Sequence, residues 1–208
     1  MIKILDRTLR DGEQTSGVSF ASEEKLSLAR LLLEDLCLDR IEVASALVSE
    51  GEFTTVQKIA RWADSKGMLD KVEVLGFVDG DKSVDWIRSA GIRVMNLLCK
   101  GSLKHCAMQL GKKTEEHIAD IRRTLEYANE AGIAVNVYLE DWSNGMKNSP
   151  EYVFALMDAL SDTKVRRFML PDTLGVLNPA DTAKFCTQML TRYPNLQFDF
   201  HAHNDYDL

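Results

Sequence analysis

The sequence predicts an α/β protein that forms a (β/α)8, or TIM, barrel, C-terminally truncated after its seventh strand. Strand-like and helix-like segments alternate along the 208 residues, which indicates a parallel sheet covered by helices. Several of the strand segments carry one polar face, and the candidate functional side chains gather near strand ends. A doubly wound open sheet buries both faces of its strands and reads as apolar throughout, so a repeated polar face favours a barrel interior.

Seven segments have the length and apolar content expected of strands. They are residues 2–8, 40–44, 71–78, 92–98, 134–140, 166–170 and 196–203. In the second segment, Ile41 and Val43 lie on one face and Glu42 lies on the other, because side chains alternate along a strand. The segments 134–140 and 196–203 show the same alternation, which indicates a polar interior facing an apolar helix layer.

Five helices are predicted between the strands, at residues 22–36, 52–65, 114–131, 150–160 and 179–191. Ser22 precedes two acidic residues, which is a typical helix start. Pro150 and Pro179 each occupy a first helical position, where the missing amide hydrogen costs nothing. The glycines at positions 67, 91 and 132 stand where helices are expected to end.

The predicted seventh strand ends close to residue 208. An eighth strand and two helices would be needed to close the barrel, so we expect residues 1–208 to form one incomplete catalytic barrel domain. Accessory and regulatory domains are expected to lie outside this chain. Because an open parallel sheet exposes unpaired edges, an inactive fragment remains an alternative for the isolated chain.

The composition restricts both partners and location. A hydrophobic content of 45% supports a sizeable core, and a net charge of -7 argues against a general nucleic-acid binder. The four cysteines have no C-x-x-C spacing, which indicates reduced thiols. No apolar run approaches the roughly 18 residues of a membrane span, and no leader pattern is evident. The sequence therefore predicts a cytoplasmic protein with no nucleic-acid or membrane partner.

Asp11, His201 and His203 are predicted to bind one divalent metal ion. The two histidines are two residues apart in a strand, so their side chains point to the same side. Asp11 follows the first strand and offers a carboxylate. This donor set leaves positions open for a substrate and suits Zn²⁺, Mn²⁺, Mg²⁺ or Co²⁺ without choosing among them. The alternative is that the paired histidines only satisfy hydrogen bonds in the barrel interior.

Three motifs lie at predicted strand ends in this order: D-R-T-L-R-D-G-E-Q-T at residues 6–15, P-D-T-L-G at 171–175 and H-A-H-N-D at 201–205. Together they resemble the DRE-TIM metallolyases, a family that includes isopropylmalate, homocitrate and citramalate synthases and hydroxymethylglutaryl-CoA lyase. The resemblance covers residues 3–208. Within the family the chain is most similar to bacterial citramalate synthases, in the stretches 17–20, 75–80, 137–145 and 204–208.

The resemblance implies an acyltransferase that condenses acetyl-CoA with a 2-oxo acid and hydrolyses the thioester. With pyruvate, the products are (R)-citramalate and CoA, on a route to isoleucine. A homodimeric full-length protein is implied as well. Two alternatives stay open: 2-isopropylmalate synthase, which uses 2-oxoisovalerate and shares all three motifs, and a carbon–carbon lyase like hydroxymethylglutaryl-CoA lyase.

The residues near the predicted metal receive distinct roles. Arg10 is expected to neutralise the keto oxygen as it gains negative charge. Glu42 is expected to pair with Arg10, either as a plain ion pair or to hold it in place. Gln14 is expected to lie beside the ligand Asp11 and to act on it without binding the metal itself. Glu140 is the candidate base for the methyl proton of acetyl-CoA, with the orientation of water or a tyrosine as its alternative. Thr173 resembles the family threonine that binds the substrate carboxylate, with a helix cap as its alternative.

Leu75, Leu98 and Tyr138 are expected to point inward near strand ends and to form an apolar wall that suits the methyl group of pyruvate. One or two methylenes are worth only about 1–3 kcal/mol in such a pocket, so small changes can switch the preferred 2-oxo acid. The alternative is that these residues are ordinary barrel core. Four further residues receive no site role: Lys100 and Lys104 are expected to be solvated, with contact to CoA phosphates as the alternative, and His105 and His117 are expected at the surface or on helices.

Overall fold

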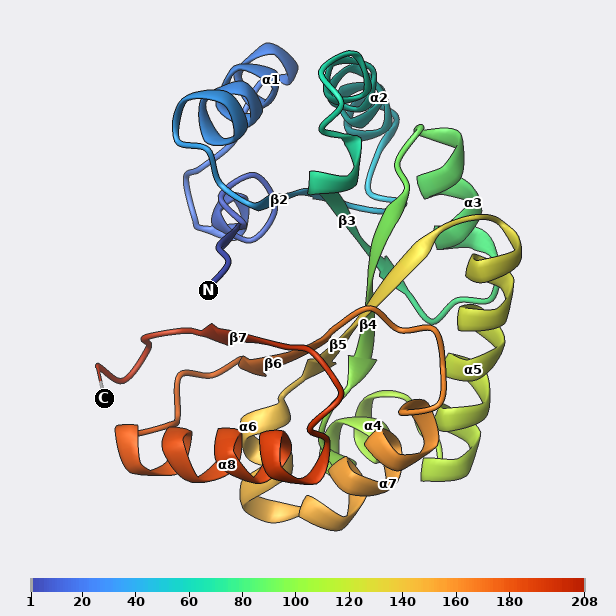
Figure 1. Cartoon of the computed structure of the whole chain (residues 1–208), viewed down its shortest axis with the longest axis vertical. Coiled ribbons are helices and arrows are strands. Elements are labelled where there is room, and N and C mark those ends of the chain that lie inside the picture. The colour runs from blue at the N-terminus through green and yellow to red at the C-terminus, as the bar shows by residue number, and fades with distance from the viewer. Residues whose placement is uncertain (1, 208) are drawn as a thin grey trace. The chain divides into compact units, whose positions relative to one another are not determined.

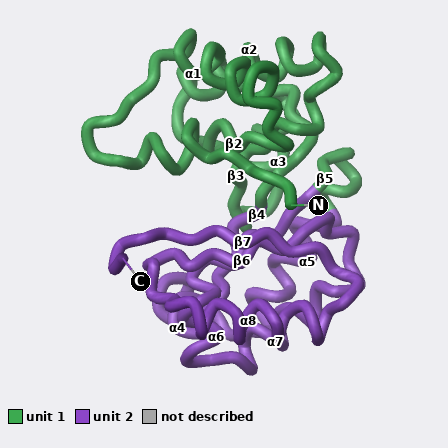
Figure 2. Tube along the Cα trace, turned by 60° about the vertical axis from the view of Figure 1, so that its left-hand side comes forward, with its two compact units in different colours: residues 1–96, 127–134 green, residues 97–126, 135–208 purple. Residues whose placement is uncertain are grey.

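The computed structural model describes residues 2–207, and its strands and helices alternate along the chain (Figure 1). The strands follow chain order in the sheet, from β1 to β7. The recorded pairs β1–β2, β2–β3, β5–β6 and β6–β7 are all parallel. These observations confirm the predicted α/β class with a parallel sheet. The chain forms two compact units, one running to Asn96 with Tyr127–Ala134 and one comprising Leu97–Glu126 with the residues from Val135 on (Figure 2).

The first unit contains three strands and the beginning of a fourth. The strands are β1 (Leu5–Asp6), β2 (Arg40–Ser45), β3 (Val72–Phe77) and the first residues of β4 (Val94–Lys100). The helices are α1 (Ser22–Arg30) with a π-helical extension (Leu31–Asp35), α2 (Glu50–Ser65), α3 (Lys82–Ser89) and two short 3₁₀ turns (Gly12–Gln14 and Leu69–Lys71). Strand β1 is shorter than predicted because the chain turns immediately afterwards: the amides of Arg10, Asp11 and Gly12 all donate to the carbonyl oxygen of Arg7.

The predicted alternation of polar and apolar faces is confirmed in this unit. Ile41 and Val43 are fully buried on one side of β2. On the other side, Glu42 Oε1 accepts a hydrogen bond from Asn96 Nδ2 at 2.7 Å. A second polar contact on that side joins Arg40 to Glu73. Charged and amide groups therefore pair with one another along this face of β2, opposite its apolar face.

The second unit contains the remaining strands and most of the remaining helices. The strands are β5 (Ala134–Glu140), β6 (Phe168–Asp172) and β7 (Phe198–Ala202), preceded by the end of β4. The helices are α4 (Leu103–Gln109), α5 (Thr114–Glu130, whose last turn belongs to the first unit), α6 (Trp142–Asn148), α7 (Pro150–Leu160) and α8 (Pro179–Arg192). Helix α8 lies alongside β6 and β7 (Figure 1).

The two proline signals mark helix starts correctly, whereas the expected cap at Ser22 is wrong, because Ser22 is the first residue of α1 and Ala21 occupies the cap position. The short helices were missed. Proline begins α7 and α8, and the side chain of Asn178 caps α8 by accepting from the amide of Asp181 at 2.8 Å. Helices α3, α4 and α6 have only seven or eight residues, too few for a helical period to stand out. Within residues 2–207, none of the helices is long and apolar enough to cross a membrane.

Two glycines let the ends of β4 and β5 and helix α6 approach closely. Gly101 follows β4, and its amide donates to the carbonyl oxygen of Glu140 at 2.6 Å. A Cβ atom on Gly101 would collide with the carbonyl oxygen of Leu139, and one on Gly145 of α6 would collide with the carbonyl oxygen of Gly101. Glycine is required at both positions because the colliding partners are backbone atoms that cannot rotate away.

We expect Gly145→Ala to lower the free energy of unfolding by about 1–3 kcal/mol, because the added methyl group overpacks the junction between α6 and the end of β4. Gly51→Ala is the matched control: it too lies in a helix, and its Cβ would meet only Ser49 Oγ, at 3.8 Å. Alanine there is neutral or stabilising. Thermal denaturation of both variants checks this prediction. Equal melting temperatures for Gly145→Ala and the wild type would contradict the close approach.

Candidate active site

The turn after β1 places Arg10 beside a buried carboxylate of the first unit. Arg10 Nε lies 2.6 Å from Glu42 Oε2, so the ion pair expected from the sequence is present. Arg7 approaches the same oxygen at 2.6 Å. Burial raises the pKa of Glu42, while the Arg7 cation and the Asn96 amide act in the opposite direction. The two guanidinium groups together keep Glu42 compensated, and Glu42 fixes the orientation of Arg10.

Arg10 also contacts the residue that follows it. Its Nη1 lies 2.9 Å from Asp11 Oδ1, and its side chain is only 8% exposed. A pocket of about 160 Å³ adjoins Arg10 and is lined by Gln14 among others. Gln14 thus lies beside Arg10, which is compatible with its expected supporting role.

A buried lysine holds the segment that carries Arg10 and Asp11. Lys25 of α1 is 2% exposed, and its Nζ lies 2.6 Å from Glu13 and 2.7 Å from Glu52 of α2. Glu13 also accepts a hydrogen bond from the amide of Phe20 at 3.0 Å. Lys25 was not predicted as a site residue from the sequence. The available signal was its spacing, since it lies four residues before the buried Ala29 on the same helix face.

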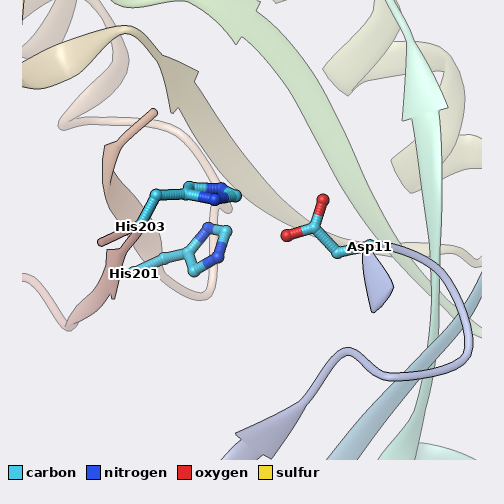
Figure 3. A group of neighbouring side chains, drawn as sticks. All are labelled: Asp11, His201 and His203. Carbon is cyan, nitrogen blue, oxygen red and sulfur yellow. The ribbon is translucent and has the colours of Figure 1, made fainter. Parts of the chain in front are cut away.

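In the second unit, His201 and His203 present their imidazoles on the same side of β7, as predicted. Their ring centroids are 4.7 Å apart, and Figure 3 draws the two rings side by side, together with Asp11. The hydroxyl of Tyr138, on β5, is hydrogen-bonded to His201 Nδ1. When Nδ1 donates its proton to that hydroxyl, Nε2 carries the ring lone pair that can bind a metal. Tyr138 was expected only as part of an apolar wall, but its hydroxyl also makes this hydrogen bond to His201.

The end of β5 carries an ion pair that the sequence analysis did not predict. Lys100 Nζ, at the end of β4, contacts Glu140 Oε2, and the two side chains are 16% and 23% exposed. The expectation of a solvated Lys100 is therefore wrong, whereas Lys104 is exposed as expected. His117, expected at the surface or on a helix, lies on α5 but is buried at 1% exposure. Its Nε2 accepts a hydrogen bond from the Lys100 amide at 3.1 Å.

Thr173 lies in the turn after β6 and contacts the end of β5. Its Oγ1 accepts a hydrogen bond from the amide of Asp141 at 2.9 Å, so its hydroxyl proton remains available to a substrate carboxylate. Asp141 has a left-handed backbone (φ 65°) and accepts from Ser102 Oγ at 2.7 Å. His105 Nε2 lies 3.5 Å from the same Asp141 oxygen. Asp141 was missed by the sequence analysis and organises the loops around Thr173.

The remaining predicted side chains occupy the expected strands. Leu75 is buried in β3 of the first unit, and Leu98 is half-buried in β4 of the second. The first unit contains Arg10, Asp11, Gln14, Glu42 and Leu75, and the other predicted site residues belong to the second. The first unit therefore contains a fixed guanidinium and a carboxylate. The second contains the histidine pair, the Lys100–Glu140 pair and the Thr173 hydroxyl.

Comparisons with known proteins place this arrangement in context. The family model described as HMGL-like matches residues 1–208. A 2-isopropylmalate synthase of Saccharolobus solfataricus is 30% identical over 209 residues, covering 100% of this chain and 52% of that protein. An (R)-citramalate synthase of Methanocaldococcus jannaschii is also 30% identical over 209 residues, covering 100% of this chain and 40% of that protein. The chain thus spans about half the length of the curated relatives it matches.

A solved structure shares the fold at lower identity. The HMG-CoA lyase of Bacillus subtilis superposes with a TM-score of 0.73 at 24% identity, over 98% of this chain and 68% of that one. Together with the seven strands in chain order, this likeness confirms the predicted TIM-barrel fold class. The two synthases match the chain equally well and are named for different products, so their similarity alone does not select one reaction.

Proposed function

The chain belongs to the HMGL-like family, and from this premise we propose that it is the catalytic barrel domain of a synthase that condenses acetyl-CoA with a 2-oxo acid. Both curated relatives described above carry synthase names. The observation that carries the proposal is the histidine pair, with Tyr138 bonded to His201 Nδ1, in the same unit as the Lys100–Glu140 pair. We place the protein in the cytoplasm, in amino-acid biosynthesis, as a homodimer of the full-length chain.

Asp11, His201 and His203 would hold a divalent metal ion. The donor set fits one: each residue offers one ligand atom, and Tyr138 orients the His201 ring so that Nε2 can bind. Two nitrogens and one carboxylate are a common catalytic set with positions left open. A divalent ion bound there would polarise the keto group of the 2-oxo acid. The donors are compatible with Mn²⁺, Zn²⁺, Mg²⁺ or Co²⁺.

The chain's own side chains supply the rest of the proposed chemistry. Arg10, fixed by Glu42, stabilises the negative charge that develops on the keto oxygen. Glu140 takes a methyl proton from acetyl-CoA, and the electron pair of that C–H bond goes to the thioester carbonyl as an enolate. The enolate carbon then attacks the keto carbon. Thr173 donates a hydrogen bond from its hydroxyl to the carboxylate of the 2-oxo acid and so orients it.

We propose pyruvate as the 2-oxo acid, which makes (R)-citramalate the product after thioester hydrolysis. Leu98 and Tyr138 lie near strand ends of the second unit and Leu75 near the end of β3, and their apolar surfaces suit a methyl group. A 2-oxoisovalerate site would need more room for the isopropyl group. Since one or two methylenes are worth about 1–3 kcal/mol, the preference is expected to be quantitative rather than absolute.

Tyr138→Phe is expected to weaken metal binding about 10–100-fold, because the ring of His201 loses the hydroxyl that orients it. A calorimetric titration of the metal-free protein with Mn²⁺ measures the affinity and checks this effect. Tyr127→Phe is the matched control: that hydroxyl bonds to Asp85 in the first unit. An unchanged Mn²⁺ affinity in Tyr138→Phe would show that the hydroxyl does not support the metal site.

The proposed function is tested with the full-length protein, Mn²⁺ and acetyl-CoA, by following the release of free CoA with a panel of 2-oxo acids. We expect the fastest release with pyruvate and slower release with 2-oxoisovalerate, and loss of both after treatment with a chelator. A preference for 2-oxoisovalerate would replace citramalate synthase by 2-isopropylmalate synthase. No release with any 2-oxo acid, despite bound metal, would overturn the synthase proposal and favour a lyase.

A further inference from the structure

Lys100 is held in place by more contacts than a strand-end lysine needs. Its ammonium contacts Glu140 Oε2, and only 16% of its side chain is exposed. Lysines at such positions usually extend into water. An ion pair that merely tied two strands together at the surface would contribute little to stability. The partner of Lys100, however, is the residue to which the proposed reaction assigns the proton transfer.

The backbone of Lys100 is fixed on both sides by side chains. Its amide donates to Nε2 of the buried His117 at 3.1 Å, and its carbonyl oxygen accepts from the Tyr152 hydroxyl at 2.8 Å. The next amide, that of Gly101, bonds to the carbonyl oxygen of Glu140 at 2.6 Å. These contacts fix the end of β4 against the end of β5, so the Lys100 side chain starts from a defined position.

The two side chains that hold the Lys100 backbone are neutral at neutral pH. Burial, and then the nearby Lys112, lower the pKa of His117 to about 4, so its imidazole accepts a hydrogen bond as a neutral ring. Burial raises the pKa of Tyr152, which therefore keeps its proton and donates. Neither group competes for the ammonium, and the charge of Lys100 is left for Glu140.

We propose that Lys100 is a positioning residue that fixes Glu140 Oε2 and so directs Oε1 to accept the methyl proton of acetyl-CoA. This inference rests on the proposed function. During the transfer, the C–H bond breaks, the proton goes to Oε1, and the electron pair moves to the thioester carbonyl oxygen. The negative charge therefore moves away from the carboxylate, while the ammonium stays beside the site and offsets it.

Three single variants test the role of Lys100. We expect Lys100→Met to lower kcat at least about tenfold, a part of the 10²–10⁴ that a general base contributes, with less than a threefold change in KM for either substrate. Lys100→Arg is expected to keep most of the wild-type kcat that Lys100→Met loses, because the cation is kept. Lys164→Met, an exposed lysine of the same unit, is the control and leaves both constants unchanged. Wild-type rates in Lys100→Met, or failure of arginine to restore activity, would overturn the inference.

A double-variant comparison separates positioning from a plain structural effect. If Lys100 acts through Glu140, Lys100→Met costs nothing further once Glu140→Gln is present, so the double variant turns over at the rate of Glu140→Gln alone. If the kcat of the double variant fell by the product of the two single-variant losses, Lys100 would act independently of Glu140, which would contradict the proposal.

Denaturant unfolding of the same four proteins reports on the pair without any turnover. We expect the changes in unfolding free energy to be non-additive, because each single substitution removes the same contact. A wild type that releases no CoA with any 2-oxo acid would overturn the proposed function, and the unfolding cycle would then decide on Lys100. Additive changes overturn the inference itself, whether or not the protein is a synthase.

Discussion

Glu140→Gln is expected to lower kcat about 10²–10⁴-fold, because the amide cannot accept the methyl proton of acetyl-CoA. The substitution keeps the size of the side chain at the end of β5, so the substrates should still bind and KM should change little. Steady-state release of CoA gives both constants. Exchange of the acetyl-CoA methyl protons with deuterated solvent, measured without a 2-oxo acid, isolates the proton-transfer step and is expected to fall with kcat.

Glu126→Gln is the matched control for this prediction. Glu126 is exposed on α5 of the same unit, so its amide variant should retain wild-type turnover and exchange. If Glu140→Gln raised KM and left kcat intact, Glu140 would contribute binding rather than proton transfer. The alternative that Glu140 only orients water or a tyrosine would then be preferred.

Arg10→Gln is expected to lower kcat about 10²–10³-fold, the usual loss when one preorganised donor to a developing oxyanion is removed. The fold should survive, because Glu42 keeps its contacts with Arg7 at 2.6 Å and Asn96 at 2.7 Å. Circular dichroism and the melting temperature check the fold, and CoA release checks the rate. Arg61→Gln, at an exposed position on α2, serves as the control.

A small effect of Arg10→Gln on turnover, together with a large loss of stability, would contradict the catalytic role. Arg10 would then act only as one of two cations that compensate the buried Glu42. Arg10→Lys distinguishes the two roles further. Lysine keeps the charge but has no planar fork that could contact Glu42 and a substrate oxygen together. The Arg10→Lys variant is therefore expected to keep part of the stability that Arg10 contributes but to have a low kcat.

The features that repeat along the chain could be predicted from the sequence. Strand β5 covers the residues over which apolar and polar side chains alternate, as in Val135, Asn136 and Val137. This alternation is visible in the sequence because successive side chains of a strand point to opposite faces. The common side of His201 and His203 follows from the same rule. The ion pair of Arg10 with Glu42 was predictable because a buried acid on an inward face needs a nearby cation.

Features that depend on a particular contact across strands could not be predicted. The sequence gives Lys100 no partner, since Glu140 is 40 residues away and the pair depends on how β4 and β5 end. His117 has a polar side chain on a helix and reads as exposed, yet it is buried because the Lys100 amide supplies its hydrogen bond. The short helix α6 was missed because it has only seven residues and because its Gly145 serves close packing rather than helix formation.

The most direct measurement of the central claim follows the new carbon–carbon bond. Full-length protein, Mn²⁺, pyruvate and acetyl-CoA labelled with ¹³C at the methyl carbon are incubated together, and the products are followed by carbon NMR. The account predicts that the label appears in the methylene group of a tertiary hydroxy diacid while CoA is released. Label found only in acetate would mean thioester hydrolysis without condensation. Unchanged acetyl-CoA here, together with cleavage of a 3-hydroxyacyl-CoA supplied in a parallel incubation, would assign a lyase; either result would contradict a synthase.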